Sequence, residues 1–167
     1  MTNHHLAIRS LRQDDFSGVR GQDDHQAFVQ RCVLDANGTL LMNRKCGNSA
    51  TALVEAVEAL VPGAVVSAAV ESCCGAANLA EELMAAGWQV SLAHATYVHK
   101  LKQSPDKTDW SDARLLVDLL RVGDLPKVWL APARLRQLRH VVRHRQQLAQ
   151  ARRAAKLRVT ALLLAER

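Results

Sequence analysis

Asp109 and Asp112 lie three residues apart in a segment that reads as the start of a helix. Side chains at this spacing project from one helix face, so the two carboxylates should lie together. The same face continues through Ala113, Leu116 and Leu120, an apolar stripe expected to pack on the core. Two like charges so placed reduce stability unless a cation lies between them, and Mg²⁺ or Mn²⁺ takes carboxylate oxygens as ligands. The pair indicates a metal site; the alternative is an acidic first turn that only complements the helix dipole.

Two further acids are candidates for the same site. Glu71 directly follows the apolar run 64–70, which is typical of a buried strand, and the carboxyl end of a central strand is where open α/β sheets place their sites. Asp23 stands before a predicted hairpin, and Asp24 is an equal candidate for its role. Taken singly, Glu71 is more often a solvated rim residue, and the alternative for Asp23 is a turn residue. Their joint occurrence with the helical pair favours a site of four carboxylates.

The elements that must position these acids follow from hydrophobic spacing and turn residues. Strands are predicted near 19–23, 27–34, 39–42, 64–70 and 88–92, and helices at 50–60, 76–86, 109–123 and 133–166. The strand, helix and strand over 64–92 form a β-α-β unit and therefore a parallel pair. The order predicts an α/β fold in which helices flank a mixed sheet.

Charge is concentrated at the carboxyl-terminal end. The chain has 22 Lys and Arg against 16 Asp and Glu, a formal net charge of +6, which favours a polyanionic partner. The predicted helix 133–166 contains no Gly or Pro, and its apolar seam of Leu135, Leu138 and Val142 is interrupted by Arg145 and Arg152. Such a helix should pair with a partner helix, contact nucleic acid, or do both.

Other classes of protein fit the composition less well. The four cysteines have no spacing suited to zinc, so reduced thiols are expected. The first fifteen residues lack the apolar stretch of a signal peptide, and no run approaches the roughly 18 apolar residues of a membrane span. We therefore expect a cytoplasmic protein with no membrane contact. The glycine-rich phosphate loops of the actin and sugar-kinase group are absent, which argues against a phosphotransferase of that kind.

Three blocks of the sequence carry a specific resemblance. They are the Glu-x-Cys-x-Gly-Ala block that starts at Glu71, the Lys-Thr-Asp-x-x-Asp-Ala block that starts at Lys107, and the Arg- and Leu-rich helix that follows. From about Val19 onward, the chain resembles the IS110-type DEDD insertion-sequence transposases, which are related to the Piv and MooV recombinases. It departs from that pattern where Arg20 and Gln22 flank Gly21, and where Cys74 replaces a common glycine.

The resemblance implies an RNase H-like fold similar to the RuvC resolvase, with catalytic, metal-binding acids at Asp23, Glu71, Asp109 and Asp112. It implies Mg²⁺- or Mn²⁺-assisted DNA strand cleavage and transfer, guided by a structured RNA. The alternative is a non-catalytic fragment that binds nucleic acid and dimerises.

The resemblance also divides the chain into parts. These are a variable extension over 1–18, an RNase H-like domain over 19–125, and a basic, coiled-coil-like extension over 126–167 that ends before a second catalytic domain. Because the family's serine nucleophile lies in that second domain, no nucleophile is assigned here, and we expect the chain alone to be inactive in recombination. A homo-oligomer through the carboxyl-terminal helix is expected.

Basic residues near the acids and on the last helix are the candidate nucleic-acid contacts. They are Lys107, Arg143, Arg145, Arg152 and Arg153. Lys100 and Lys102 lie before the acidic helix and are candidates for contacts to phosphates; the alternative is that they are solvated loop residues.

Overall fold

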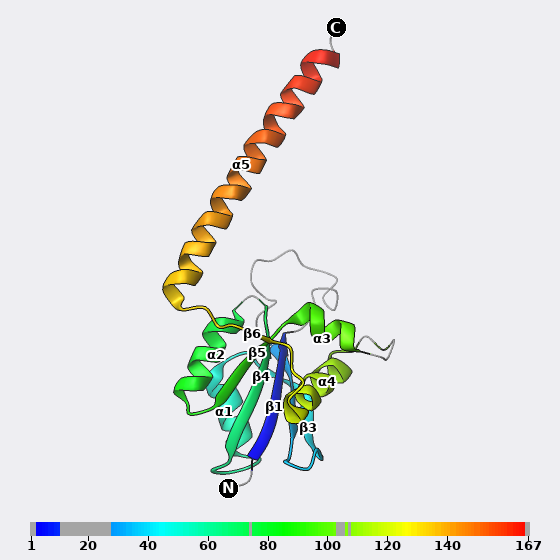
Figure 1. Ribbon diagram of the computed structural model, residues 1–167, viewed down its shortest axis with the longest axis vertical. Coiled ribbons are helices and arrows are strands. Elements are labelled where there is room, and N and C mark those ends of the chain that lie inside the picture. The colour runs from blue at the N-terminus through cyan, green and yellow to red at the C-terminus, as the bar shows by residue number, and fades with distance from the viewer. Residues whose placement is uncertain (1–2, 11–27, 74, 103–105, 107, 166–167) are drawn as a thin grey trace. The chain divides into compact units, whose positions relative to one another are not determined.

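A computed structural model describes residues 3–10, 28–73, 75–102, 106 and 108–165 (Figure 1). The chain divides into two compact units, Met1–Trp129 and Leu130–Arg167, and each is described by itself. The first unit contains the sheet, and the second contains one long helix. No helix in the described part of the chain is long and apolar enough to cross a membrane.

The sheet has six strands in the order β3-β2-β1-β4-β5-β6. The strands are β1 (Asn3–Ser10), β2 (Phe28–Leu34), β3 (Leu40–Gly47), β4 (Val65–Glu71), β5 (Gln89–Ala93) and β6 (Lys127–Val128). β1 is parallel to β4, which is parallel to β5, while β2, β3 and β6 join their neighbours antiparallel. The predicted mixed sheet and the parallel pair across the β-α-β unit are both confirmed.

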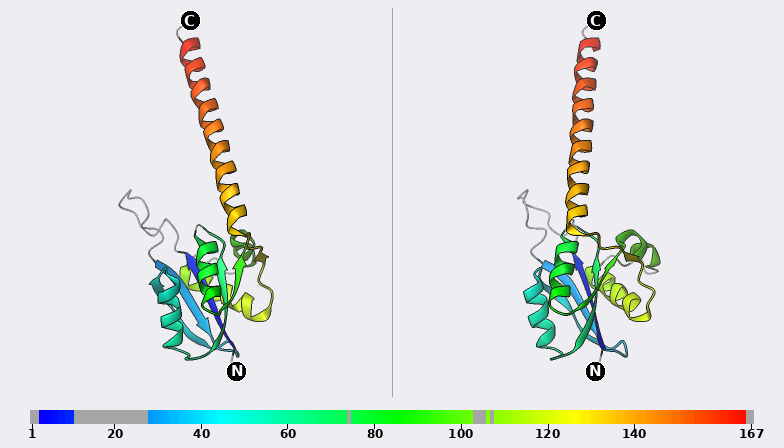
Figure 2. Two further views of the ribbon diagram at one scale, coloured as in Figure 1. Left: turned by 90° about the vertical axis from the view of Figure 1, so that its left-hand side faces the viewer. Right: turned by 60° about the vertical axis from the view of Figure 1, so that its left-hand side comes forward.

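Helices cover both faces of this sheet. They are α1 (Ala50–Glu58), α2 (Ala76–Ala85), α3 (Ala95–Leu101) and α4 (Asp109–Val122), while α5 (Ala133–Ala165) forms the second unit. Figure 2 shows α1 and α2 on one face and α4 on the other. The α/β class is therefore confirmed, as is the long basic helix after the sheet.

Small residues let α4 lie close to the middle of the sheet. Ala7, Ala69 and Ala93 present one methyl group each beneath Ala113 and Leu116 of α4, and all five are buried. On the other face of β4, Val66, Ala68 and Val70 are buried as well. A strand covered on both faces reads as a continuous apolar run, which is why β4 was predictable.

The first strand differs from the prediction. Residues Asn3–Ser10, which the sequence analysis placed in a variable extension, form β1 between β2 and β4, so that assignment is corrected for these residues. Leu6, Ala7 and Ile8 are almost fully buried. Three apolar residues after two histidines are too short a run to stand out, and pairing on both edges is what stabilises this strand. The strand predicted near 19–23 lies outside the described residues.

Candidate functional site

Glu71 is the last residue of β4 and pairs in register with Ala93 of the neighbouring strand. This position confirms the prediction that Glu71 lies at the carboxyl end of a central strand. Its half-buried side chain also lines a cavity of about 210 Å³ beside the start of α2, together with Asn48, Asn78 and Glu82. Glu71 therefore offers its carboxylate at the edge where parallel α/β sheets bind ligands.

Asp112 is the one buried carboxylate in the described part of the chain, with 8% of its surface exposed. It lies in the first turn of α4, where a negative charge complements the helix dipole. Its Oδ1 accepts a hydrogen bond from Lys102 Nζ in an ion pair whose side chains are 9% and 10% exposed. Lys102 Nζ also donates to Ser111 Oγ at 3.0 Å. A positive charge is thus held against the buried acid.

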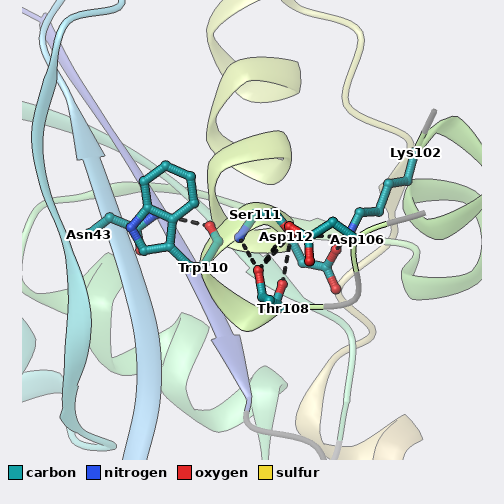
Figure 3. Close-up of polar contacts among 7 residues, drawn as sticks. All are labelled: Asn43, Lys102, Asp106, Thr108, Trp110, Ser111 and Asp112. Carbon is teal, nitrogen blue, oxygen red and sulfur yellow. Dashed lines mark hydrogen bonds and ion pairs between the residues drawn. The ribbon is translucent and has the colours of Figure 1, made fainter. Parts of the chain in front are cut away.

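Thr108 fixes the start of α4 and so the position of both helical acids (Figure 3). It has an extended backbone, and its Oγ1 accepts a hydrogen bond from Ser111 N at 3.2 Å, while Ser111 Oγ donates to the Thr108 carbonyl at 3.0 Å. Thr108 Oγ1 also donates to Asp106 Oδ2 at 3.2 Å. These contacts form a standard N-cap, which satisfies a backbone donor that the helix itself leaves unpaired.

Thr108→Ala should lower the free energy of unfolding by about 1 kcal/mol, because the Ser111 amide loses its acceptor. Thr108→Ser keeps the hydroxyl and is the matched control, expected to stay within about 0.5 kcal/mol of the parent. Urea denaturation of the three proteins measures both values. Equal stability of the Ala and Ser variants would show that the cap does not stabilise α4.

The other predicted ligands do not form a metal-binding group with Asp112 among the described residues. Asp109 is the first residue of α4 and is half-buried. Across the residues that the structure describes, no group of three His, Cys, Asp or Glu side chains is arranged to hold a metal ion. Asp23, its alternative Asp24, and Lys107 lie outside the described residues. The four-carboxylate arrangement therefore stays a prediction.

The donor chemistry of the predicted acids nevertheless fits a divalent cation. Glu71, Asp109 and Asp112 offer the oxygen ligands that Mg²⁺ and Mn²⁺ prefer. A buried carboxylate that already holds an ammonium group shows that the first turn of α4 accommodates a positive charge. The positive charge that the structure shows against Asp112 is that of Lys102.

Sequence reasoning missed the role of Lys102. It was expected to contact phosphate or solvent, and it is instead buried and paired with Asp112. Lys102 is the C-cap of α3, a seven-residue helix that was not predicted at all. Lys100 does lie at the surface, with Nζ 5.5 Å from the centre of the Tyr97 ring. No spacing rule would have distinguished these two lysines.

The second unit is a separate candidate site for nucleic acid. Along α5, Ala133–Ala165, there are nine Lys and Arg residues and no Asp or Glu, and no residue is buried. The four predicted contact residues Arg143, Arg145, Arg152 and Arg153 are all exposed. Apolar side chains are exposed on the same helix, including Leu148 at 58% and Leu162 at 69%.

Most of the chain matches a family model. Residues 21–166 match the transposase family of the DEDD, IS110 type. The match includes all four predicted acids and continues through α5. No curated protein matches the chain.

Proposed function

This chain belongs to the IS110-type DEDD transposase family, and from that premise we propose that it is the metal-binding part of an enzyme that cleaves and transfers DNA strands during insertion-sequence transposition. The observation that carries the proposal is the family match over residues 21–166, which includes an acid at the end of the central strand and two in the first turn of α4. Guidance by a structured RNA belongs to the same proposal.

Glu71, Asp109 and Asp112 would hold Mg²⁺ or Mn²⁺, with Asp23 or Asp24 as a fourth ligand. Such an ion, when bound, stabilises negative charge on the oxygens around a phosphate under attack. Other residues of the protein would hold the carboxylates of these acids in place. Thr108 fixes the start of α4, which carries Asp109 and Asp112. We assign the covalent nucleophile to none of these residues.

We propose that α5 contributes contacts to nucleic-acid phosphates. Its exposed arginines can reach a phosphate backbone, and an arginine guanidinium suits phosphate geometry. Self-association through the same helix would bring nine positive charges of one copy against nine of another, with no acid on either helix to offset them. A bound polyanion removes this repulsion, so a homo-oligomer should form most readily on DNA or RNA.

A second candidate function is a non-catalytic fragment that binds nucleic acid and assembles. Two observations favour it: Asp112 is already paired with Lys102, and the described acids do not form a three-ligand group. The two candidates differ in whether the acids bind metal. Both require α5 to contact nucleic acid.

Calorimetric titration with Mn²⁺ separates the two candidates. Asp109→Asn combined with Asp112→Asn should abolish binding, because two of the proposed ligands lose their charge. The matched control is Asp118→Asn combined with Asp124→Asn, which removes two acids from the carboxyl-terminal half of α4 and the loop after it, and should bind like the parent. Circular dichroism confirms that each variant is folded at the temperature of the titration. No Mn²⁺ binding by the parent would favour the non-catalytic candidate.

A further inference from the structure

We propose that Lys102 is a resident cation that competes with divalent metal for Asp112, an inference that rests on the proposed metal-binding function. In the metal-free protein the ammonium group neutralises the buried acid, and metal binds at Asp112 only when that group withdraws. Lys102 would thereby set how much metal the protein needs. It is a positioning residue, because it acts through Asp112.

The geometry of Lys102 differs from that of a surface ion pair. Its Nζ donates to Asp112 Oδ1 and to Ser111 Oγ, so both contacts are made with the first turn of α4. Both members of the pair are nine-tenths buried. The Arg114–Asp118 pair of the same helix is an instructive contrast, because its side chains are 30% and 35% exposed. Of these two pairs, the Lys102–Asp112 pair is the one withdrawn from water, and a charge that is buried in this way needs a close partner.

A divalent ion and the Lys102 ammonium group would repel each other if both contacted the Asp112 carboxylate. A divalent ion held by Asp112 would contact the same carboxylate oxygens directly. The ammonium group, already in hydrogen-bond contact with Oδ1, would then be close to a second, larger positive charge. Lys102 can move aside, because its four-carbon stem is flexible and its backbone caps the end of α3. Metal binding is therefore coupled to the release of Lys102.

The direct test is a Mn²⁺ titration of Lys102→Met, which keeps the length of the stem and removes the charge. Its affinity should rise by about tenfold or more, because the metal no longer displaces a resident cation. Lys100→Met is the matched control, since Lys100 lies at the surface of the same helix, and its affinity should not change. In chelator, Lys102→Met should melt at a lower temperature than the parent, and adding Asp112→Asn to it should restore part of the loss.

A second measurement uses the unmodified protein and does not depend on the folding of a variant. An amine-acylating reagent followed by mass spectrometry reports how accessible Lys102 is. Saturating Mn²⁺ should increase its modification several-fold, while that of Lys100 stays constant. An unchanged rate at Lys102 with metal bound would overturn the inference.

The outcomes separate this inference from the proposed function. Equal Mn²⁺ affinity of the parent and Lys102→Met would overturn the competition and leave the metal site standing. Binding by Lys102→Met alone would support the competition, and would show that the natural chain does not hold metal unaided. Absence of binding in both proteins would overturn both proposals.

Discussion

Asp112→Ala should lower the free energy of unfolding by about 3–5 kcal/mol in the presence of a chelator, the largest effect expected for any single acid of α4. The substitution leaves the Lys102 ammonium buried, with Ser111 Oγ as its one remaining partner among the contacts described. A buried charge that loses its counter-ion is strongly destabilising. Urea denaturation followed by far-ultraviolet circular dichroism measures the change.

Asp118→Ala is the matched control for this prediction. It also removes an aspartate from an ion pair of α4, but the Arg114–Asp118 pair is about one-third exposed. Exposed pairs of this kind contribute about 0.2–1 kcal/mol, so the control should stay close to the parent. If Asp112→Ala is as stable as Asp118→Ala, the buried pair does not hold the start of α4.

This prediction reverses an expectation from the sequence. Spacing placed two carboxylates on one helix face, so their removal should relieve repulsion in the absence of metal. Spacing along one helix cannot show that a lysine ten residues before Asp112 contacts it. Lys102 is the C-cap of α3 and Asp112 lies in the first turn of α4, so the contact joins two helices and no periodicity within either one records it. The prediction that both acids lie at the start of a helix is confirmed, but it did not include the positive charge of Lys102 beside Asp112.

The elements around the sheet also differ in whether the local sequence alone predicts them. β4 and α4 were predictable because each has a burial pattern of its own, a continuous run for the strand and a stripe for the helix. β1 was not, because Leu6, Ala7 and Ile8 become a strand through hydrogen bonds to β2 and β4 on both sides. Glu71 was identified from the sequence because it directly follows the continuous apolar run 64–70.

The second large effect concerns the arginines of α5. Replacing Arg143, Arg145, Arg152 and Arg153 with Gln should weaken binding to duplex DNA and flatten its dependence on salt. Each phosphate contact releases condensed counter-ions, so each arginine lost should reduce the slope of log K against log salt by about 0.9 for duplex and about 0.7 for single strands. If all four contact duplex phosphates, the parent should lose roughly 100-fold more affinity than the variant between about 50 and 200 mM salt.

The matched control changes the same helix without changing its charge. It replaces four glutamines of α5 with Ala, at Gln137, Gln146, Gln147 and Gln150. Its salt dependence should equal that of the parent, because no phosphate-contacting charge is lost. Fluorescence anisotropy of labelled duplex DNA, titrated at several salt concentrations, gives the slopes. An equal slope in the arginine variant would show that these four residues do not contact phosphate.

Salt also separates the two roles proposed for α5, because it acts on them in opposite directions. Binding to a polyanion weakens as salt rises, because the counter-ions released on binding gain less entropy when the surrounding salt concentration is high. Association of two α5 helices should strengthen, since salt screens the repulsion between nine positive charges on each copy and leaves contacts between residues such as Leu148 and Leu162 unaffected. Sedimentation of the free chain should therefore show more dimer at high salt, and the arginine variant should dimerise already at low salt. Dimerisation of the parent that falls as salt rises would mean that ionic contacts outside α5 hold the two copies together.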